Sequence, residues 1–341
     1  MATENLSTGF SDNFKFSERE VLNYIKLMIN KSMFSQAIEY INQIKLPPIS
    51  FSTKFHLNIM EQFIKLLIYQ GYIKKAESVV IKVKNRAFDL ELVDLYNKLN
   101  VWDSVIKKSL NQSYASVPIF ESLDIFYDDI EDDLVKVMIL LTASHLPDFI
   151  ASQEHFLTEA NRILSETKNK SVPDYPYIKT TVMNAMGVFQ GLLGDIHGCK
   201  SILEATIDEA KEIGDVRRTA GSMTNLAYLY FLDGSMTPES QLMGRSMLQD
   251  SIKLSEEIGA LEYQMITNLH LAEYYKNRGK AKLAIPYYNR VYEIQKQRGI
   301  MEGNEKIDAI FAKAINGTSE INPDVEVVAQ EIKENIENLQ I

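Results

Sequence analysis

The sequence has few of the features that would reveal an extracellular or membrane protein. Its 341 residues include one cysteine, Cys199, which excludes an internal disulfide framework and fits a reducing compartment. Apolar runs such as Val137 to Leu141 are far too short to span a bilayer. The opening segment MATENLSTGFSDNFKF lacks the basic stretch and apolar run of a secretory signal. We therefore expect a soluble intracellular protein with no membrane partner.

Positive charge is also scarce. Lysine and arginine total 36 against 46 aspartate and glutamate residues, which gives a net charge of -10. A broad nucleic-acid surface needs clustered basic residues to neutralise phosphates. The composition therefore predicts no direct binding of nucleic acid, and any link to chromatin would pass through another protein.

Catalytic and metal-binding patterns are missing as well. The five histidines lack partners at the i, i+4 spacing that puts two metal ligands on one helical face; they are His56, His145, His155, His197 and His270. No expected strand leads into a glycine-rich phosphate loop. We expect no catalytic residues, no metal and no cofactor, and hence a protein that is not an enzyme.

Glycines, by contrast, fall at regular intervals near the C-terminal end. The intervals are 20, 20, 25, 20 and 20 residues, between Gly194, Gly214, Gly234, Gly259, Gly279 and Gly299. A helix of about 15 to 18 residues and a tight turn fill such an interval, and glycine closes helices in the left-handed conformation. The longer interval contains Thr237-Pro238, which marks a longer turn. Residues 176–299 are therefore predicted to form three antiparallel helix pairs.

Small residues recur at matching places in these pairs. One set lies seven residues before the glycine that ends each first helix, and the other lies about five residues after it; the sets are Gly187, Ala227 and Ala272, and Cys199, Gly244 and Ala284. Small side chains are needed where the two helices of a hairpin cross closely. The pattern is typical of tetratricopeptide repeats, so the fold class predicted is all-α, a right-handed superhelical solenoid of antiparallel helix pairs.

The remaining chain follows the same plan less regularly. We expect a disordered tail at 1–16, an irregular helical-repeat region at 17–168, and a linker with a C-terminal capping helix at 300–341. The expected pairs of the irregular region are 18–30 with 33–44, 55–69 with 73–83, 90–99 with 101–110, and 134–146 with 151–165. Trp102 is interpreted as a packing residue. The last helix, which starts at Asn322-Pro323, covers the apolar end of the solenoid or binds a partner.

Acidic residues are concentrated between Glu121 and Asp133, where seven of 13 positions are acids. One interpretation is a solvated surface with a negative lead into a helix at Leu134, which the helix dipole favours. The other is a docking site for a basic partner.

Candidate partner-binding residues lie near the end of the repeats. From Lys276 to Arg298 seven basic residues oppose one acid, Glu293, with tyrosines among them. Of these, Tyr275 and Tyr288 are expected in the core, and Tyr274, Tyr287 and Tyr292 at the surface. The candidate set is Asn225, Asn268, Tyr274, Lys276, Arg278, Lys280, Lys282, Arg290 and Lys296. The basic segment would bind an acidic peptide, or it is an ordinary charged end of a solenoid.

The asparagines of this set come from the first helices of the repeats. Together with Asn184, they are placed where tetratricopeptide solenoids present polar side chains to an extended peptide. Their spacing from the following glycine varies by one or two residues. Exposed residues without a binding role would show the same pattern.

Four stretches resemble a known family. They are PPISFSTKFHLNIMEQFIKLLIYQGYIKKA from Pro47, TTVMNAMGVFQGLLGD from Thr180, DVRRTAGSMTNLAYLYFLDGS from Asp215 and ITNLHLAEYYKNRGKAKLA from Ile266. In order and spacing they resemble the C-terminal half of the smaller, tetratricopeptide-containing subunit of the cohesin loader, the Mau family. The resemblance implies a nuclear, chromosome-associated scaffold whose partner is the large HEAT-repeat loader subunit, with a role in sister chromatid cohesion. The family brings no catalytic residues to this chain.

A second hypothesis remains open. The chain would then be an intracellular tetratricopeptide peptide receptor or regulator, or an adaptor of another complex, in the cytoplasm. Residues 1–50 contain no convincing helix-turn-helix for a direct output on DNA.

Overall fold

The computed structural model describes residues 17–44, 52–110, 112, 114–232 and 237–298. These residues form fourteen α-helices and contain no strand. The N-terminal helices are α1 (Glu18–Asn30), α2 (Phe34–Ile44), α3 (Thr53–Tyr69), α4 (Ile73–Asp89), α5 (Val93–Ser109), α6 (Val117–Asp124), α7 (Asp133–Ala143) and α8 (Gln153–Glu166). The C-terminal helices are α9 (Tyr175–Leu192), α10 (Ile196–Ile213), α11 (Val216–Leu232), α12 (Pro238–Glu257), α13 (Leu261–Lys276) and α14 (Ala281–Arg298). Three 3-10 turns lie at Tyr127–Asp129, Pro147–Ser152 and Asn169–Ser171.

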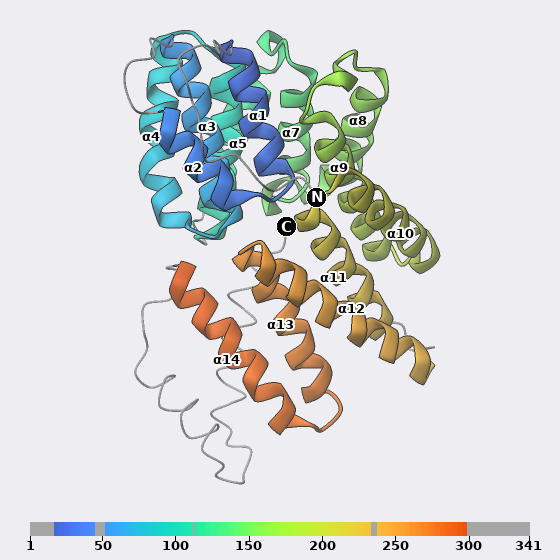
Figure 1. Ribbon diagram of the computed structural model, residues 1–341. Helices are drawn as coiled ribbons and strands as arrows, with labels where there is room; N and C mark the ends of the chain where they lie inside the picture. The colour runs from blue at the N-terminus through green and yellow to red at the C-terminus, as the bar shows by residue number, and fades with distance from the viewer. Residues whose placement is uncertain (1–16, 45–51, 111, 113, 233–236, 299–341) are drawn as a thin grey trace.

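The last six helices confirm the three predicted antiparallel pairs, α9 with α10, α11 with α12, and α13 with α14 (Figure 1). Gly194, Gly214, Gly259 and Gly279 all have positive φ, between 67° and 86°, at the ends of helices. Glycine takes this conformation without the steric cost that a Cβ would bring. Gly234 and Gly299 lie outside the described residues. The chain is an all-α solenoid in which each pair packs on the next.

The small residues meet where the helices of a pair cross. A Cβ added to Gly244 would lie 3.0 Å from Tyr230 Cβ and 3.2 Å from the Ala227 carbonyl oxygen. A Cβ on Gly187 would lie 3.0 Å from Leu203 Cδ2. Ala227 and Ala272 are fully buried, and Cys199 and Ala284 nearly so. The predicted repeat register is therefore confirmed.

One predicted pair in the N-terminal half is wrong. Instead of two short helices at 90–99 and 101–110, α5 runs unbroken from Val93 to Ser109 and pairs with α6. No glycine or proline separates the two predicted helices. The polar residue between them, Asn100, stays inside the helix because its amide donates to Ser122 Oγ at 3.1 Å. The other three predicted pairs are present as α1 with α2, α3 with α4, and α7 with α8.

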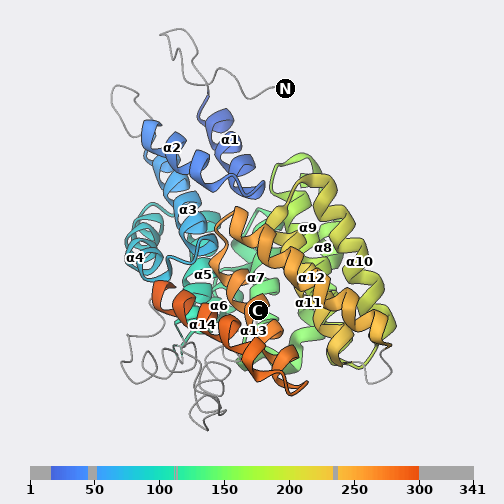
Figure 2. The same ribbon diagram turned by 60° about the horizontal axis from the view of Figure 1, so that its bottom comes forward.

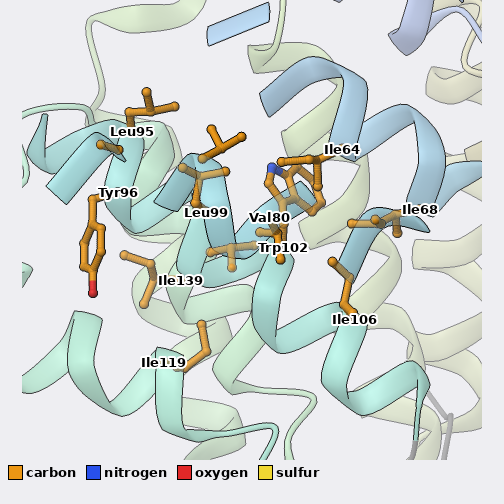
Figure 3. Packing of buried hydrophobic residues seen from close by; sticks show 14 of the residues in the cluster. Ile64, Ile68, Val80, Leu95, Tyr96, Leu99, Trp102, Ile106, Ile119 and Ile139 are labelled. Carbon is orange, nitrogen blue, oxygen red and sulfur yellow. The ribbon is translucent and has the colours of Figure 1, made fainter. Parts of the chain in front are cut away.

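The largest core cluster joins α3, α4, α5, α6 and α7. Figure 3 shows Ile64, Val80 and Leu99 gathered with Trp102, whose exposed fraction is 7%. Trp102 is a packing residue, as predicted. Its indole N–H donates to Glu61 Oε1 at 2.6 Å, which satisfies the polar end of the ring.

The acidic segment is divided between several short elements. Asp132 precedes α7, and its carboxylate accepts the Leu134 N–H at 3.0 Å, so the negative lead into this helix is confirmed. Asp133 accepts from the Thr167 hydroxyl at 2.7 Å. The remaining acids of α6 and the following turn are mostly exposed. A docking site for a basic partner stays a prediction.

The solenoid curls until its last helix pair contacts the second pair. Figure 2 shows one end of α14 next to α4, although the two helices are far apart in the sequence. Gly71, in the turn between α3 and α4, lies where a Cβ would be 3.0 Å from Leu261 Cβ and 3.2 Å from Arg298 Cγ. Its φ of 81° and this close approach both require glycine. Residues about 190 to 230 positions away are thereby brought into contact.

Asp174, directly before α9, ties this helix to the first two pairs. Its carboxylate lies 2.7 Å from Lys26 Nζ and 3.6 Å from Lys65 Nζ, and it accepts from Asn30 Nδ2 at 3.0 Å. Lys65 also donates to Asn30 Oδ1 at 2.8 Å. Burial opposes the charged carboxylate, but the two lysines and the hydrogen bonds outweigh it and hold the pKa of Asp174 well below its ordinary 3.8.

The predicted tail at 1–16 and the predicted linker and capping helix at 300–341 lie outside the described residues. The division of the remaining chain into an irregular region and three regular repeats stays an interpretation.

Replacing Ala227 by leucine will lower the free energy of unfolding by about 1 to 3 kcal/mol, because the larger side chain has no room against Gly244. Chemical denaturation measures the loss. Ala205→Leu on the exposed face of α10 is the matched control, with an expected change within about 0.5 kcal/mol. Equal stability of the two variants would contradict the crossing geometry.

Asp174→Asn will lower the free energy of unfolding by about 3 kcal/mol near neutral pH. This value is at the lower end of the range for breaking a buried ion pair, because the side chains of Lys26 and Asp174 are each 17% exposed. A carboxylate whose pKa is lower in the folded than in the unfolded protein stabilises the folded state at pH values above its unfolded-state pKa. That contribution is lost as the pH falls through the folded-state pKa. The difference in the free energy of unfolding between wild type and Asp174→Asn should be constant above about pH 5 and become smaller below about pH 4. Urea unfolding at several pH values measures it, with Asp208→Asn on the exposed face of α10 as the control. A difference in the free energy of unfolding that does not change with pH would contradict the role assigned to Asp174.

Candidate functional site

A concave groove runs along the inside of the superhelix, with a volume of about 210 Å³. Every one of the seven helix pairs contributes side chains from its first helix or from the residues beside it. The lining includes Lys26, Glu61, Lys65, Tyr69, Lys98, Trp102, Lys108, Met138, His145, Asp174, Ile178, Thr181, Asn184, Arg217, Arg218, Gly221, Asn225, Glu262, Tyr263 and Ile266. The second helices α2, α4, α6, α8, α10, α12 and α14 contribute none of the lining. The groove is thus a product of the repeat architecture.

The groove is basic although the chain is acidic. Six lysine and arginine side chains line it against three carboxylates, those of Glu61, Asp174 and Glu262, whereas the whole chain carries -10. Lys26 and Lys65 are paired with Asp174, and Lys98 lies 3.4 Å from Asp132. The remaining cations of the lining are Lys108, Arg217 and Arg218. An anionic ligand group would meet a favourable local potential here.

One wall of the groove is a stack of aromatic and cationic groups. The Arg217 guanidinium of α11 lies 3.9 Å from the centre of the Tyr69 ring of α3. Its Nη1 is 3.4 Å from the Tyr263 hydroxyl of α13. Tyr69 in turn meets Trp102 edge to face, with ring centres 6.3 Å apart. These contacts join four first helices, α3, α5, α11 and α13, from both halves of the chain, and they give the groove a partly aromatic surface.

Two asparagines of the lining, one from α9 and one from α11, are hydrogen-bonded to each other. Asn184 Oδ1 accepts from Ser222 Oγ at 2.8 Å and from Asn225 Nδ2 at 3.2 Å. The Asn184 amide N–H groups and the Asn225 carbonyl are then the groups left to face a ligand. A donor and an acceptor side by side match the backbone of an extended peptide.

The inner part of the groove holds a histidine between two cations. Lys108 Nζ donates to the His145 carbonyl at 2.8 Å. Burial, with Lys108 and Arg218 close by, lowers the pKa of His145 to about 3, so its ring is neutral at physiological pH. Burial also lowers the pKa of Lys108 to about 8, with the negative charge of Glu262 acting in the opposite direction.

Of the candidate set only Asn225 lines the groove, together with Asn184, the asparagine noted beside that set. Asn268 is buried, at 4% exposure, and its amide donates to the Gln264 carbonyl of its own helix at 2.6 Å. The two asparagines differ in register from the small residues Ala227 and Ala272, and each residue of offset turns a helical side chain by about 100°. Asn268 therefore points into the helix pair.

The predicted basic segment lies at the edge of the last repeat. Lys276, Lys280 and Lys282 are exposed. Arg278 stacks on Tyr274 at 3.8 Å, and Arg290 donates to Gln264 Oε1 at 3.0 Å. Lys296 lies 5.3 Å from the Tyr292 ring. The structure therefore spreads these residues along α13 and α14 and does not bring them into the groove.

The tyrosines of this segment follow the prediction with one exception. Tyr275 and Tyr288 are buried as predicted, at 7% and 3% exposure, while Tyr274 and Tyr287 are half-buried. The prediction of a surface position for Tyr292 is wrong, because its exposure is 1%. It lies four residues after Tyr288, so both rings share the inward face of α14.

Sequence reasoning missed most of the groove. Tyr69, Trp102, Arg217 and Arg218 were not among the candidates. A usable signal was present in α11, where polar or small residues at Arg217, Gly221 and Asn225 recur at four-residue steps along one face. A concave surface that is open to solvent needs polar or small side chains along one face of each first helix, and this row of residues provides them.

No group of three or more histidine, cysteine, aspartate or glutamate side chains that could hold a metal ion occurs in the described ranges. Over the same ranges no single helix is both long and apolar enough to cross a bilayer. The segments Asp133–Ala143 and Pro147–Glu166 reach that length and hydropathy only when counted together, across a bend of 111°.

Comparisons with known proteins give a structural likeness and no family. No family model matches the chain, and no curated protein matches it, so membership of the Mau family is not shown. Among solved structures the chain is similar to the apo form of the quorum sensor NprR from B. thuringiensis. The identity is 14%, the TM-score is 0.43, and the match covers 87% of each chain. The likeness concerns the helical-repeat arrangement alone.

The His145 ring should stay neutral between about pH 5 and 8, in the range where histidines usually titrate. Its ring NMR signals will therefore be flat over that range and move only at lower pH. Arg218→Met removes one of the nearby positive charges and should raise the pKa of His145. A normal titration in the wild type would mean that the ring does not lie in this buried, cationic setting.

Proposed function

We propose that this chain is a non-enzymatic receptor that holds an extended peptide segment of a protein partner in its concave groove. The observation that supports this best is the reversal of charge: an acidic chain gathers six cations, three large aromatic side chains and two asparagine amides on the inside of one superhelix. These groups offer an extended peptide apolar contacts, backbone hydrogen bonds and attraction for acidic groups.

The shape of the groove supports an extended ligand. Its volume of about 210 Å³ has room for a few side chains and not for a folded domain. The lining comes from successive first helices, so binding sites repeat along the groove as they would along a peptide. A peptide also provides main-chain donors and acceptors for Asn184 and Asn225.

The test is selection of random-sequence peptides on the purified chain. Enriched peptides will bind the wild type, and the signal of Trp102, the one tryptophan, will change on binding because this side chain lines the groove. Asn225→Trp fills the groove and should weaken binding about tenfold or more, since it removes a hydrogen-bonding pair and adds bulk. Asn161→Trp, on the exposed face of α8, is the control and should bind as the wild type does.

Failure to enrich any peptide, or binding that Asn225→Trp leaves unchanged, would refute the groove as the receptor site.

A second variant separates the groove from the basic segment of α13 and α14. The triple change Lys276→Glu, Lys280→Glu and Lys282→Glu reverses exposed charges outside the groove. We expect it to leave the affinity of groove peptides within about threefold at physiological salt, where exposed charges are screened. A loss as large as that of Asn225→Trp would instead assign peptide binding to this segment.

The cohesin-loader role is a narrower form of the proposal. The colinear stretches that begin at Pro47, Thr180, Asp215 and Ile266 are what supports it. The groove would then hold a segment of the large HEAT-repeat loader subunit, and the protein would be nuclear and chromosome-associated. Purification of the tagged endogenous protein tests this. Reproducible absence of a HEAT-repeat loader subunit and of cohesin would leave the general, cytoplasmic peptide receptor.

A further inference from the structure

The inner part of the groove contains a positive charge for which the described residues provide no carboxylate. Arg218 is 6% exposed, yet no carboxylate of the described chain lies within 4 Å of its guanidinium. Its Nη2 donates to Thr181 Oγ1 at 3.0 Å, and its Nε–H has no acceptor among the residues that the structure describes. Burying an unpaired charge is costly, so its retention points to a partner that arrives from outside.

The acid that is nearest in sequence is otherwise engaged. Asp215 comes three residues before Arg218, and its carboxylate accepts the backbone N–H of Arg218 at 2.9 Å. It therefore caps the start of α11 and does not form an ion pair with the guanidinium. The guanidinium is held in place by Thr181 of α9, which itself donates to the Tyr177 carbonyl.

Other groups around Arg218 reinforce the positive potential. Lys108 of α5 is fixed by the carbonyl of His145, and both Lys108 and Arg218 lie close enough to the imidazole to depress its pKa. Glu262 of α13 is the acid that faces Lys108 from across the groove. With Arg217 and the buried carboxylate of Asp215 included, three cations and a neutral imidazole face two carboxylates, so the balance of charge around Arg218 is positive. An imidazole N–H would be a further donor to an anion.

We propose that Arg218, with Lys108 and His145, forms a subsite for one carboxylate of the bound peptide, namely the free carboxylate at its C-terminus. This inference rests on the proposed peptide-receptor function. It adds the direction in which the peptide lies in the groove and the requirement for a free C-terminus. A guanidinium presents a planar set of donors that matches a carboxylate, and the neighbouring ammonium adds a second charge-assisted bond. Lys108 belongs to α5 and Arg218 to α11, so the subsite lies between side chains of these two helices.

The wild type alone provides a first test. A groove peptide from the selection is synthesised with a free C-terminal carboxylate, with a C-terminal amide, and with the amide plus a glutamate as last residue. The free carboxylate should bind about ten- to a hundredfold more tightly than the amide, the size expected for charge-assisted hydrogen bonds. Equal affinity of carboxylate and amide overturns the subsite. Restoration of full affinity by the terminal glutamate would overturn end-specificity.

Variants then assign the effect to Arg218. Arg218→Gln should remove the difference between carboxylate and amide, whatever its effect on the affinity of the amide peptide itself, a coupling that general loss of structure would not produce. Arg218→Lys should restore part of the difference. Arg86→Gln, the same change on the exposed face of α4, should keep the wild-type preference. An Arg218→Gln protein that still prefers the carboxylate would overturn the assignment.

Added inorganic phosphate identifies the source of the anion. At about 10 mM it should compete weakly with the carboxylate peptide and not at all with the amide. Strong competition with both would show a phosphate site in place of a peptide-terminus site. Failure of the receptor function itself is distinct, because then no peptide form binds and Asn225→Trp has no effect.

Discussion

The close crossing of helices within each pair is the constraint on which the groove depends. Where Ala227 meets Gly244, the carbonyl of one helix would lie 3.2 Å from an added Cβ on the other, so no larger side chain fits between them. This contact fixes how the first and second helices sit relative to each other. Because the same small residues recur in successive pairs, all first helices turn toward the same side. Among the described residues, the inner face is built from α1, α3, α5, α7, α9, α11 and α13 and from residues directly beside them.

Closure of the superhelix determines the electrostatics of that inner face. Gly71 packs against Leu261, and Asp174 joins α9 to the lysines of α1 and α3. These contacts bound the groove on several sides, and several of its charged and polar side chains are buried. Charges inside are screened less than charges on an open surface. The lowered pKa values of His145 and Lys108 follow from this enclosure.

The groove also shows why net charge describes this protein poorly. A total of -10 would suggest repulsion of acidic ligands. The acids are carried largely by outer surfaces such as the segment around Asp128 and Glu131, whereas Lys108, Arg217 and Arg218 face inward. Recognition depends on the potential at the binding surface, and here its sign is opposite to that of the whole chain.

The sequence by itself determined the helix pairs of the C-terminal half. Gly214, Ala227 and Gly244 act through local spacing, since a glycine closes the helix that precedes it and a small residue marks a crossing within one hairpin. The same reasoning was wrong at α5, where Asn100 is accommodated by a partner on another helix, and at Tyr292, whose burial is decided by neighbouring helices.

Tertiary structure alone decided the candidate site. Arg217 meets Tyr69, and Asp174 meets Lys26, only because the superhelix curls and brings distant repeats together. Asn225 and Asn268 look equivalent in sequence, yet a register offset of two residues puts one in the groove and the other in the core. The hairpins depend on contacts between residues near in sequence, and the groove depends on the accumulated rotation of seven stacked pairs, which no local pattern specifies.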